Sequence, residues 1–201
     1  MGMVIGLATI GDDNAALMLA DPPLVWKVVA PEEPYLYVQA VAAANRPSLL
    51  ARLIGSKPAP PPGPNFVLRP PEGLTTDLDK SWHGIHYLLT GTAEESDRPL
   101  TFLVSGGQTV GDIDVGYGPA RAFTAEQTRA IHAALDAVTD DQLRARFDPT
   151  AMMRLEIYPE IWDRYPASPE PLDYLLEYVA ILRSFLRQAV DGGLGLVVTL
   201  T

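Results

Sequence analysis

The sequence predicts a predominantly helical α+β fold, built as a single domain over residues 1–201 around a small sheet. Apolar segments at residues 4–10 and 194–201 are typical of strands, and we expect these two terminal strands to pair in that sheet. Between them, helix start and stop signals recur along the chain, most clearly around a long apolar helix at residues 171–190. This combination of many helices and few strands favours the α+β class.

The N-terminal part is predicted to be a strand followed by helices. The strand at residues 4–10 ends at Gly11, and residues 12–20 form a short helix. Pro22 and Pro23 stop that helix, because proline lacks the amide hydrogen that a helix interior needs. We expect further helical pieces between residues 24 and 54, broken at Pro31, Pro34 and Pro47.

A proline-rich stretch follows at residues 57–73, with seven of the chain's 19 prolines. Such a segment is extended and polyproline-like, and it continues neither a helix nor a central strand. We predict a connector that crosses the surface or a locally disordered loop. A ligand for an SH3-type domain is the alternative.

The middle of the chain mixes one clear helix with short elements. Residues 77–89 are predicted to be helical, with Gly91 placed to receive the C-terminus of the helix. Residues 99–104 are apolar but too short for periodicity to separate strand from helix. We expect a glycine-rich loop at residues 106–119 and then a short strand at residues 120–123.

Two capping boxes come next. In each, a threonine precedes a helix, and a glutamine three residues later reaches back to the amide of that threonine. Thr124 and Gln127 open one helix, and Thr139 and Gln142 open the next. The later helix at residues 171–190 has such a wide apolar surface that we expect other elements to wrap most of its circumference.

The composition favours a cytoplasmic protein. The chain contains no cysteine, which excludes disulfides and Cys-ligated zinc and fits a reducing compartment. The formal charge of −10 argues against nucleic acid and anionic lipid as partners. No apolar run is long enough to span a membrane, and the N-terminus lacks the basic start of a signal peptide. The acidity serves solubility or attracts a basic protein partner.

The stretch DKSWHGIHYLLTG, residues 79–91, holds two of the three histidines and carries the main candidates for chemistry. On a helical wheel, Asp79, His83 and His86 point within about 40° of one direction. A carboxylate and two imidazoles so arranged can bind a metal ion or form an Asp–His pair that acts as a general base. The same helix has an adjacent apolar face formed by Leu78, Trp82, Ile85 and Leu89.

The metal interpretation is the weaker one. The spacing of His83 and His86 differs from the HExxH pattern, and the remaining histidine, His132, belongs to another helix. We therefore predict no metal and no cofactor. The histidines are then either boundary residues bonded to backbone or part of a ligand pocket.

The glycine-rich segment offers a second candidate. Its spacing fits neither a dinucleotide fingerprint nor a P-loop. Its exposed amides can cradle an anion, with Arg121 nearby as a fork-shaped donor. The alternative is that the glycines only permit tight turns.

Several segments together resemble the YfbM-like family, a bacterial domain of unknown function. They are the MGM start, LDKSWHGIHYLLTG, DVGYGPAR, RFDP, IYPEIWD and YLLEY, in that order along the chain. The resemblance implies a compact, cytosolic α+β domain and no particular activity. The resemblance also implies that Trp82 and His86 belong to the family pattern more firmly than His83 does. The proline-rich stretch is longer here than the resemblance leads one to expect.

We predict a non-enzymatic module that binds a small ligand or a protein partner. Its site is expected between the flank of the helix at Asp79–His86 and the loop that ends in Tyr117 and Arg121. The alternative is an enzyme in which Asp79 orients His86 as a general acid or base while Arg121 holds an anionic substrate. The predicted ligand-binding residues are Trp82, His83, His86, Tyr117 and Arg121.

Overall fold

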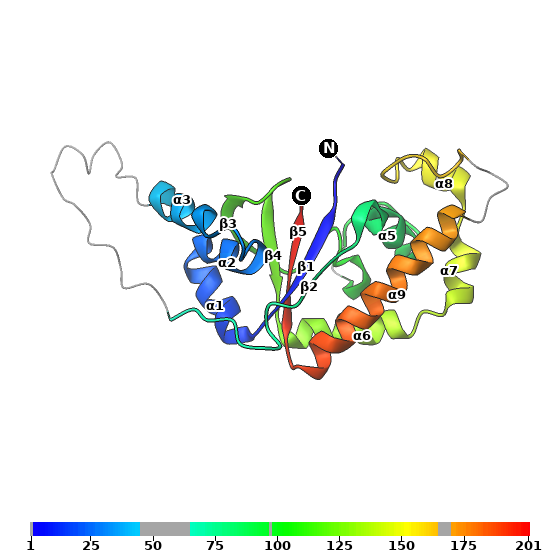
Figure 1. Ribbon diagram of the computed structural model, residues 1–201. Helices are drawn as coiled ribbons and strands as arrows, with labels where there is room; N and C mark the ends of the chain where they lie inside the picture. The colour runs from blue at the N-terminus through cyan, green and yellow to red at the C-terminus, as the bar shows by residue number, and fades with distance from the viewer. Residues whose placement is uncertain (1, 45–64, 97, 165–169) are drawn as a thin grey trace.

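A computed structural model describes residues 2–44, 65–96, 98–164 and 170–201 of the chain. A five-stranded sheet separates two groups of helices, so the molecule has three layers (Figure 1). Helices α1 to α3 lie on one side of the sheet, and helices α5 to α9 lie on the other. The predicted α+β class, mostly helical around a small sheet, is confirmed.

All neighbouring strands in the sheet are antiparallel. The terminal strands pair directly at its centre, with Ile5 opposite Leu200 and Ile10 opposite Gly195, which confirms the predicted pairing of the chain ends. In spatial order the strands are β2 (Thr75–Asp77), β1 (Ile5–Ile10), β5 (Gly195–Leu200), β4 (Pro119–Phe123) and β3 (Gln108–Asp114).

Alternating side chains of the central strands feed two cores. Ile5 and Leu7 pack with helices α5, α6 and α9, whereas Ala8 and Ile10 pack with helices α1 and α2. Because successive side chains of a strand point to opposite faces, an apolar strand of this kind is buried on both sides. Both helical layers therefore pack against the centre of the sheet, one on each face.

The first helical layer follows the sequence prediction closely. Helix α1 spans Asp12–Ala20 as predicted, and the turn η1 (Pro22–Leu24) follows the proline stop. Helices α2 (Val25–Val29) and α3 (Pro34–Ala44) are separated around Pro31. The predicted break at Pro47 lies outside the described residues.

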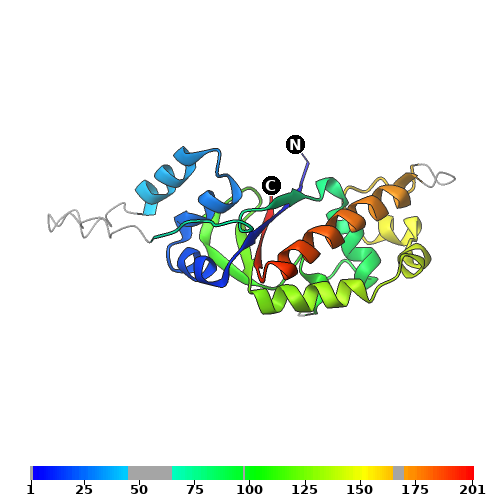
Figure 2. The same ribbon diagram turned by 60° about the horizontal axis from the view of Figure 1, so that its bottom comes forward.

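The second layer is larger and contains the candidate site. It consists of η2 (Asp79–Ser81), α5 (Trp82–Thr90), η3 (Pro99–Thr101), α6 (Ala125–Asp136), α7 (Asp140–Arg146), α8 (Pro149–Arg154) and α9 (Glu170–Asp191). Figure 2 shows α6 running alongside α9 next to the sheet. None of the helices in the described ranges is long and apolar enough to cross a bilayer.

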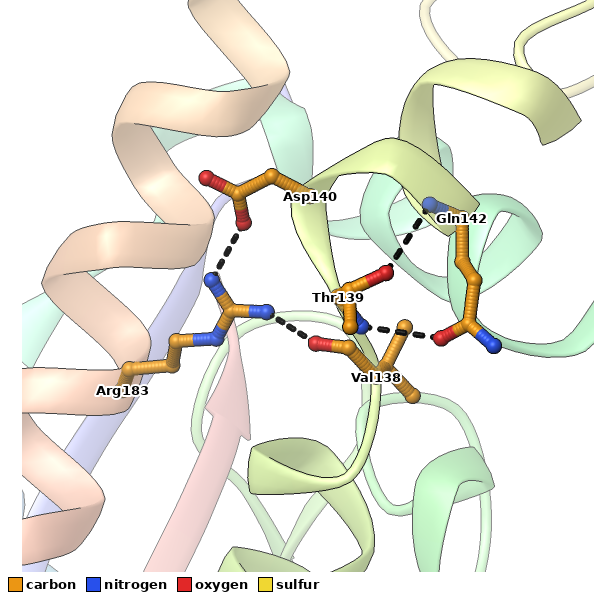
Figure 3. A network of polar contacts seen from close by, with 5 residues as sticks. All are labelled: Val138, Thr139, Asp140, Gln142 and Arg183. Carbon is orange, nitrogen blue, oxygen red and sulfur yellow. Dashed lines mark hydrogen bonds and ion pairs between the residues drawn. The ribbon is translucent and has the colours of Figure 1, made fainter.

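Both capping boxes are present, at Thr124 and at Thr139. At the second box, Arg183 of α9 donates to the Val138 carbonyl and forms an ion pair with Asp140 (Figure 3). The start of α7 is thereby fixed both by its own cap and by a neighbouring helix. These contacts hold the turn between α6 and α7 against α9.

The wide apolar surface of α9 is not wrapped as predicted. Leu175, Val179 and Leu182 are buried, but Ile181 is 36% exposed and Tyr178 only half-buried. Helix α9 therefore buries one side and leaves the other in solvent, as an amphipathic surface helix does. Its aromatic residues widen the boundary of the buried side instead of meeting a further element.

Two predicted elements are wrong in part. The helix expected at residues 77–89 begins at Trp82, because residues 75–77 pair with β1 as strand β2 instead. The expected loop at residues 106–119 contains strand β3, whose register shifts beside Gly111. The strand expected at residues 120–123 is confirmed as β4, and residues 99–101 form the 3-10 turn η3. Gly91 ends α5 in the left-handed conformation, as predicted.

The proline-rich stretch is described from residue 65 onward, and residues 57–64 lie outside the described residues. Residues 65–73 contain neither helix nor strand, which agrees with a connector. Glu72 ties this segment to the start of α1, because its carboxylate accepts hydrogen bonds from the Gly11 amide at 2.7 Å and the Asn14 side chain at 2.8 Å. The connector therefore lies against the first layer.

Candidate functional site

Asp79 does not share a face with the two histidines. It lies in η2, before α5 begins, and its φ of 44° places it in the left-handed region. Its carboxylate accepts a hydrogen bond of 2.9 Å from the Tyr174 hydroxyl of α9. The helical wheel misplaced Asp79 because the α-helical periodicity does not extend back to it. The predicted orientation of His86 by Asp79 is therefore wrong.

His83 is half-buried, and backbone groups hydrogen-bond to its ring. Its Nδ1 accepts a hydrogen bond of 3.0 Å from the Tyr158 amide, and the ring is also hydrogen-bonded to the Ala93 backbone. Burial lowers the pKa of His83 to about 4, and the neighbouring His86 adds to that lowering. The imidazole is therefore neutral near pH 7, which suits a wall of a site better than a proton carrier.

His86 is fully buried, one turn further along α5. Its Nε2 lies 3.2 Å from the Glu94 carbonyl oxygen, so Nε2 carries the proton and donates it. Burial lowers the pKa of His86. Among the described residues its Nδ1 has no hydrogen-bond partner. A histidine without solvent contact cannot exchange protons with a substrate unless the segment at residues 92–95 moves.

Trp82 is the central ring of an aromatic stack. The His83 ring lies on it with centroids 4.9 Å apart, and the Tyr158 ring stacks at 5.9 Å. The indole Nε1 donates to the Met3 carbonyl at 3.2 Å. The stack and this hydrogen bond therefore join α5, the residues just before β1 and the segment after α8.

Tyr117 and Arg121 come from the hairpin between β3 and β4. Tyr117 sits at the tip, where its amide donates to the Leu200 carbonyl at 2.8 Å while its side chain is 54% exposed. Arg121 lies on β4 and donates to the carbonyls of Leu103 at 2.8 Å and Gly106 at 3.1 Å. The hairpin thus brings a free phenol and a guanidinium beside the wall of α5.

These side chains line one cavity of about 300 Å³, which we call the α5–β4 cleft. Trp82 and His83 line it from α5, Tyr117 and Arg121 line it from the β3–β4 hairpin, and His86 lies outside the lining. Four of the five predicted binding residues are thus brought together. The cleft is lined by Ile5, Trp82, His83, Ala93, Glu95, Leu103, Val104, Tyr117, Pro119, Arg121, Val198, Thr199 and Leu200.

The charges in the cleft belong to Arg121 and Glu95. Burial lowers the pKa of Arg121, and the nearby Glu95 carboxylate opposes that shift. Arginine nevertheless stays protonated in proteins. Arg121 forms no ion pair within the described ranges, so no carboxylate of those ranges lies within 4 Å of its guanidinium nitrogens. The guanidinium keeps its charge, and only two of its five N–H groups are used by the two carbonyls.

Sequence reasoning missed the segment that covers α5 and the strand that floors the cleft. Ala93 and Glu95 follow the end of α5 without any motif, so no signal marked them. Val198 and Leu200 belong to the terminal strand, and their alternation with Val197 indicated which of them share a face. The cleft floor was therefore within reach of the sequence, whereas its rim was not.

The arrangement offers no metal centre. In the part of the chain that the structure describes, no three His, Asp or Glu side chains gather in a way that could hold a metal ion. His83 and His86 have ring centroids 6.2 Å apart, but the Tyr158 amide holds His83, the Glu94 carbonyl holds His86, and Asp79 bonds to Tyr174. The cleft can therefore bind through aromatic faces, one cation and one carboxylate.

Comparisons with known proteins agree with this fold. The family model described as "Domain of unknown function (DUF1877)" matches residues 1–199. A solved structure, the protein of unknown function YfbM from Escherichia coli, is similar with a TM-score of 0.63 over 98% of this chain and 99% of that chain. The sequence identity is 15%, so the likeness concerns the fold alone. No curated protein matches the chain.

Proposed function

We propose that this chain, which belongs to the DUF1877 family of domains of unknown function, is a non-enzymatic module that binds a small carboxylate in the α5–β4 cleft. The observation that carries the proposal is the meeting of Trp82, His83, Tyr117 and Arg121 around one cavity. These residues come from two segments far apart in sequence. Aromatic faces with a few polar groups are typical of ligand sites.

The charges define the kind of ligand. Arg121 offers unused N–H groups to a carboxylate, for which its fork-shaped geometry is well suited. Glu95, in the same lining, attracts a hydrogen-bond donor such as a hydroxyl or an ammonium group. A small hydroxy acid or amino acid carries both groups. Ile5, Val198 and Leu200 supply an apolar floor for its carbon skeleton.

The size of the cleft favours a small molecule over a protein partner. A volume of about 300 Å³ stands at the lower end of the range of small-molecule sites, ~300–1,000 Å³. A protein interface usually extends over ~800 Å² on each partner. The protein-partner interpretation thus has less support, although the −10 charge still allows a basic partner elsewhere on the surface.

The enzymatic alternative has less support as well. General acid–base catalysis needs a group within hydrogen-bond reach of the substrate and a pKa near the working pH. His86 is fully buried, and burial lowers its pKa. The accessible histidine, His83, has a pKa of about 4, and its Nδ1 already accepts a hydrogen bond from the Tyr158 amide. A cytoplasmic location stays a prediction that cell fractionation can check.

The test is thermal unfolding of the wild type with hydroxy acids, amino acids and their neutral amides. A ligand at 100 times its Kd adds about 2.7 kcal/mol, which for a chain of this size raises Tm by roughly 5–10 °C. We expect carboxylates to raise Tm and their amides to leave it unchanged.

Two tyrosine variants provide the matched comparison. Tyr117 and Tyr35 are both 54% exposed, but only Tyr117 lines the cleft. Tyr117→Ser should weaken binding by about tenfold, and Tyr35→Ser should keep the wild-type response. Equal responses of the two variants, or equal shifts with acid and amide, would contradict the proposal. The absence of any shift with the whole panel would contradict it too.

A further inference from the structure

A second cavity of about 350 Å³ lies on the other side of the turn at residues 103–107, and we call it the η3–α6 cavity. Its lining shares no residue with that of the α5–β4 cleft. It is lined by Ser96, Arg98, Pro99, Phe102, Ser105, Gly106, Gly107, Phe123, Gln127, Ala130 and Ile131. It therefore counts as a separate candidate site.

The bottom of the η3–α6 cavity is apolar and firm. Phe102 and Phe123 meet edge to face with ring centroids 6.4 Å apart. Together with Ile131 they belong to the core between the sheet and helices α5, α6 and α9. All three side chains are almost fully buried. An apolar or aromatic group of a ligand would therefore meet a preformed surface.

Among the described residues that line this cavity, Arg98 has the one charged side chain. The Arg98 side chain is exposed, and among the described residues it has no hydrogen bond or ion pair. Both serine hydroxyls already have partners, because the Ser105 hydroxyl donates to the Ser96 carbonyl at 2.9 Å and the Ser96 hydroxyl accepts from the Arg98 amide at 3.3 Å. A polar ligand group would thus meet a guanidinium that the described part of the chain leaves without a partner.

The turn adds a backbone donor. Arg121 binds the Gly106 carbonyl from the cleft side. In a trans peptide the next N–H points the opposite way, so the Gly107 amide is directed away from Arg121. This amide has no hydrogen-bond partner in the described ranges, and Gly107 lines the η3–α6 cavity.

Glycine is required at this place. Gly107 has a φ of 72°, and a Cβ there would lie 2.8 Å from the Ala122 carbonyl oxygen. A side chain would therefore strain the backbone and push the turn off β4. The backbone of the turn is held by Arg121 on one side and presents its amide on the other.

We propose that the η3–α6 cavity binds an amphipathic anion, a phosphate monoester with a small apolar or aromatic group. The phosphate sits between the Arg98 guanidinium and the Gly107 amide, and the apolar group rests on Phe102, Phe123 and Ile131. Arginine and exposed turn amides together are suited to phosphate, which has several acceptor oxygens. In this proposal the glycine-rich segment binds an anion together with Arg98, whereas the sequence had suggested that Arg121 would be the arginine beside it.

The experiment is a titration with phenyl phosphate followed by two-dimensional ¹H–¹⁵N NMR spectra of the full chain. We expect the Gly107 amide signal to shift with saturation, while the amide of Gly91, a left-handed glycine at the end of α5, stays in place. Phenol, which has the ring but no phosphate, should produce no saturable shift of Gly107. Inorganic phosphate should bind at least tenfold more weakly than phenyl phosphate.

The matched variants are Arg98→Gln and Arg129→Gln. Both arginines are exposed, and Arg129 lies on α6 beside the cavity without lining it. Arg98→Gln should raise the Kd for phenyl phosphate by tenfold or more, and Arg129→Gln should change it less than twofold. Equal losses in both variants would reduce the effect to general charge attraction and overturn the proposal. So would a titration without a Gly107 shift.

This inference is independent of the proposed function. Tyr117→Ser, which removes a residue of the cleft, should leave phenyl phosphate binding unchanged. Conversely, Arg98→Gln should leave the carboxylate-induced rise in Tm unchanged. Loss of phenyl phosphate binding in Tyr117→Ser would mean that the phosphate occupies the cleft, and the η3–α6 site would then be rejected.

Discussion

His83→Asn should remove a specific part of the pH dependence of folding stability. The pKa of His83 is lowered to about 4 in the folded protein from an ordinary value of 6.5, chiefly by burial. The unfolded chain therefore binds a proton on His83 at a higher pH than the folded chain does. The stability that this histidine contributes is fully present above pH 6.5 and is lost as the pH falls towards and through 4.

The magnitude follows from the two pKa values. At about 1.36 kcal/mol per pKa unit, a fully buried group would lose roughly 2–2.5 kcal/mol of unfolding free energy between pH 7 and pH 4.5. His83 borders the cleft and is only half-buried, so solvent screening reduces this to roughly 1–2 kcal/mol. Asparagine keeps an acceptor oxygen for the Tyr158 amide but does not titrate.

The assay is urea unfolding of the wild type and His83→Asn at pH 7, 5.5 and 4.5. Losing the bond to Ala93 lowers the stability of the variant at every pH, whereas titration changes only the slope. The carboxylates and His86 remain in both proteins, so the difference between the two pH profiles isolates His83. If both proteins lose the same free energy between pH 7 and pH 4.5, burial does not hold His83 neutral and the reasoning fails.

Two further predictions concern the framework of the site. Gly84→Ala should lower the free energy of unfolding by ~1–3 kcal/mol, because the new Cβ would lie 2.7 Å from Leu175 and 2.8 Å from the Trp162 ring. This overpacking outweighs the ~1 kcal/mol that alanine gains over glycine in helix propensity. A variant that is more stable than the wild type in urea would contradict the prediction. Thr124→Ala should cost ~0.5–2 kcal/mol through loss of the α6 cap, measured in the same way, with Thr124→Ser as the control that retains the cap.

The sequence predicted best the features that depend on neighbouring residues alone. The caps at Thr124 and Thr139 need only a threonine, a glutamine three residues later and a helix. Helix α1 likewise ends where the proline pair begins. The pairing of β1 with β5 is a long-range contact, and it was predictable because both strands are almost wholly apolar and lie at the chain ends.

The wrong predictions share a tertiary cause. Residues 75–77 have no apolar side chain, and they become a strand because the edge of β1 offers backbone partners. Strand β3 forms within a glycine-rich segment because β4 pairs with it, although the register of the pair shifts beside Gly111. A Cβ at Gly111 would lie 2.7 Å from Pro22, so that glycine lets β3 approach η1. Such contacts override local propensity.

The sequence could predict that two segments meet at the candidate site. It could not predict which of the site's side chains are buried and which are accessible. A helical wheel gives the direction of a side chain, and it contains no information on what covers that direction. The Glu94 carbonyl bonds to the fully buried His86, whereas His83 lines the cleft together with Ala93 and Glu95. The distinction between the buried and the accessible histidine therefore depends on a segment without any sequence signal.

Arg121 connects the two proposed sites, and for that reason it is a poor residue with which to test either. Its guanidinium lines the α5–β4 cleft while it holds the carbonyls of Leu103 and Gly106 in the turn that separates the cleft from the η3–α6 cavity. Replacing Arg121 would release that turn, change the direction of the Gly107 amide and remove a charge from the cleft at once. Tyr117 and Arg98 each line one site only, so their variants separate a carboxylate bound on one side of the turn from a phosphate bound on the other.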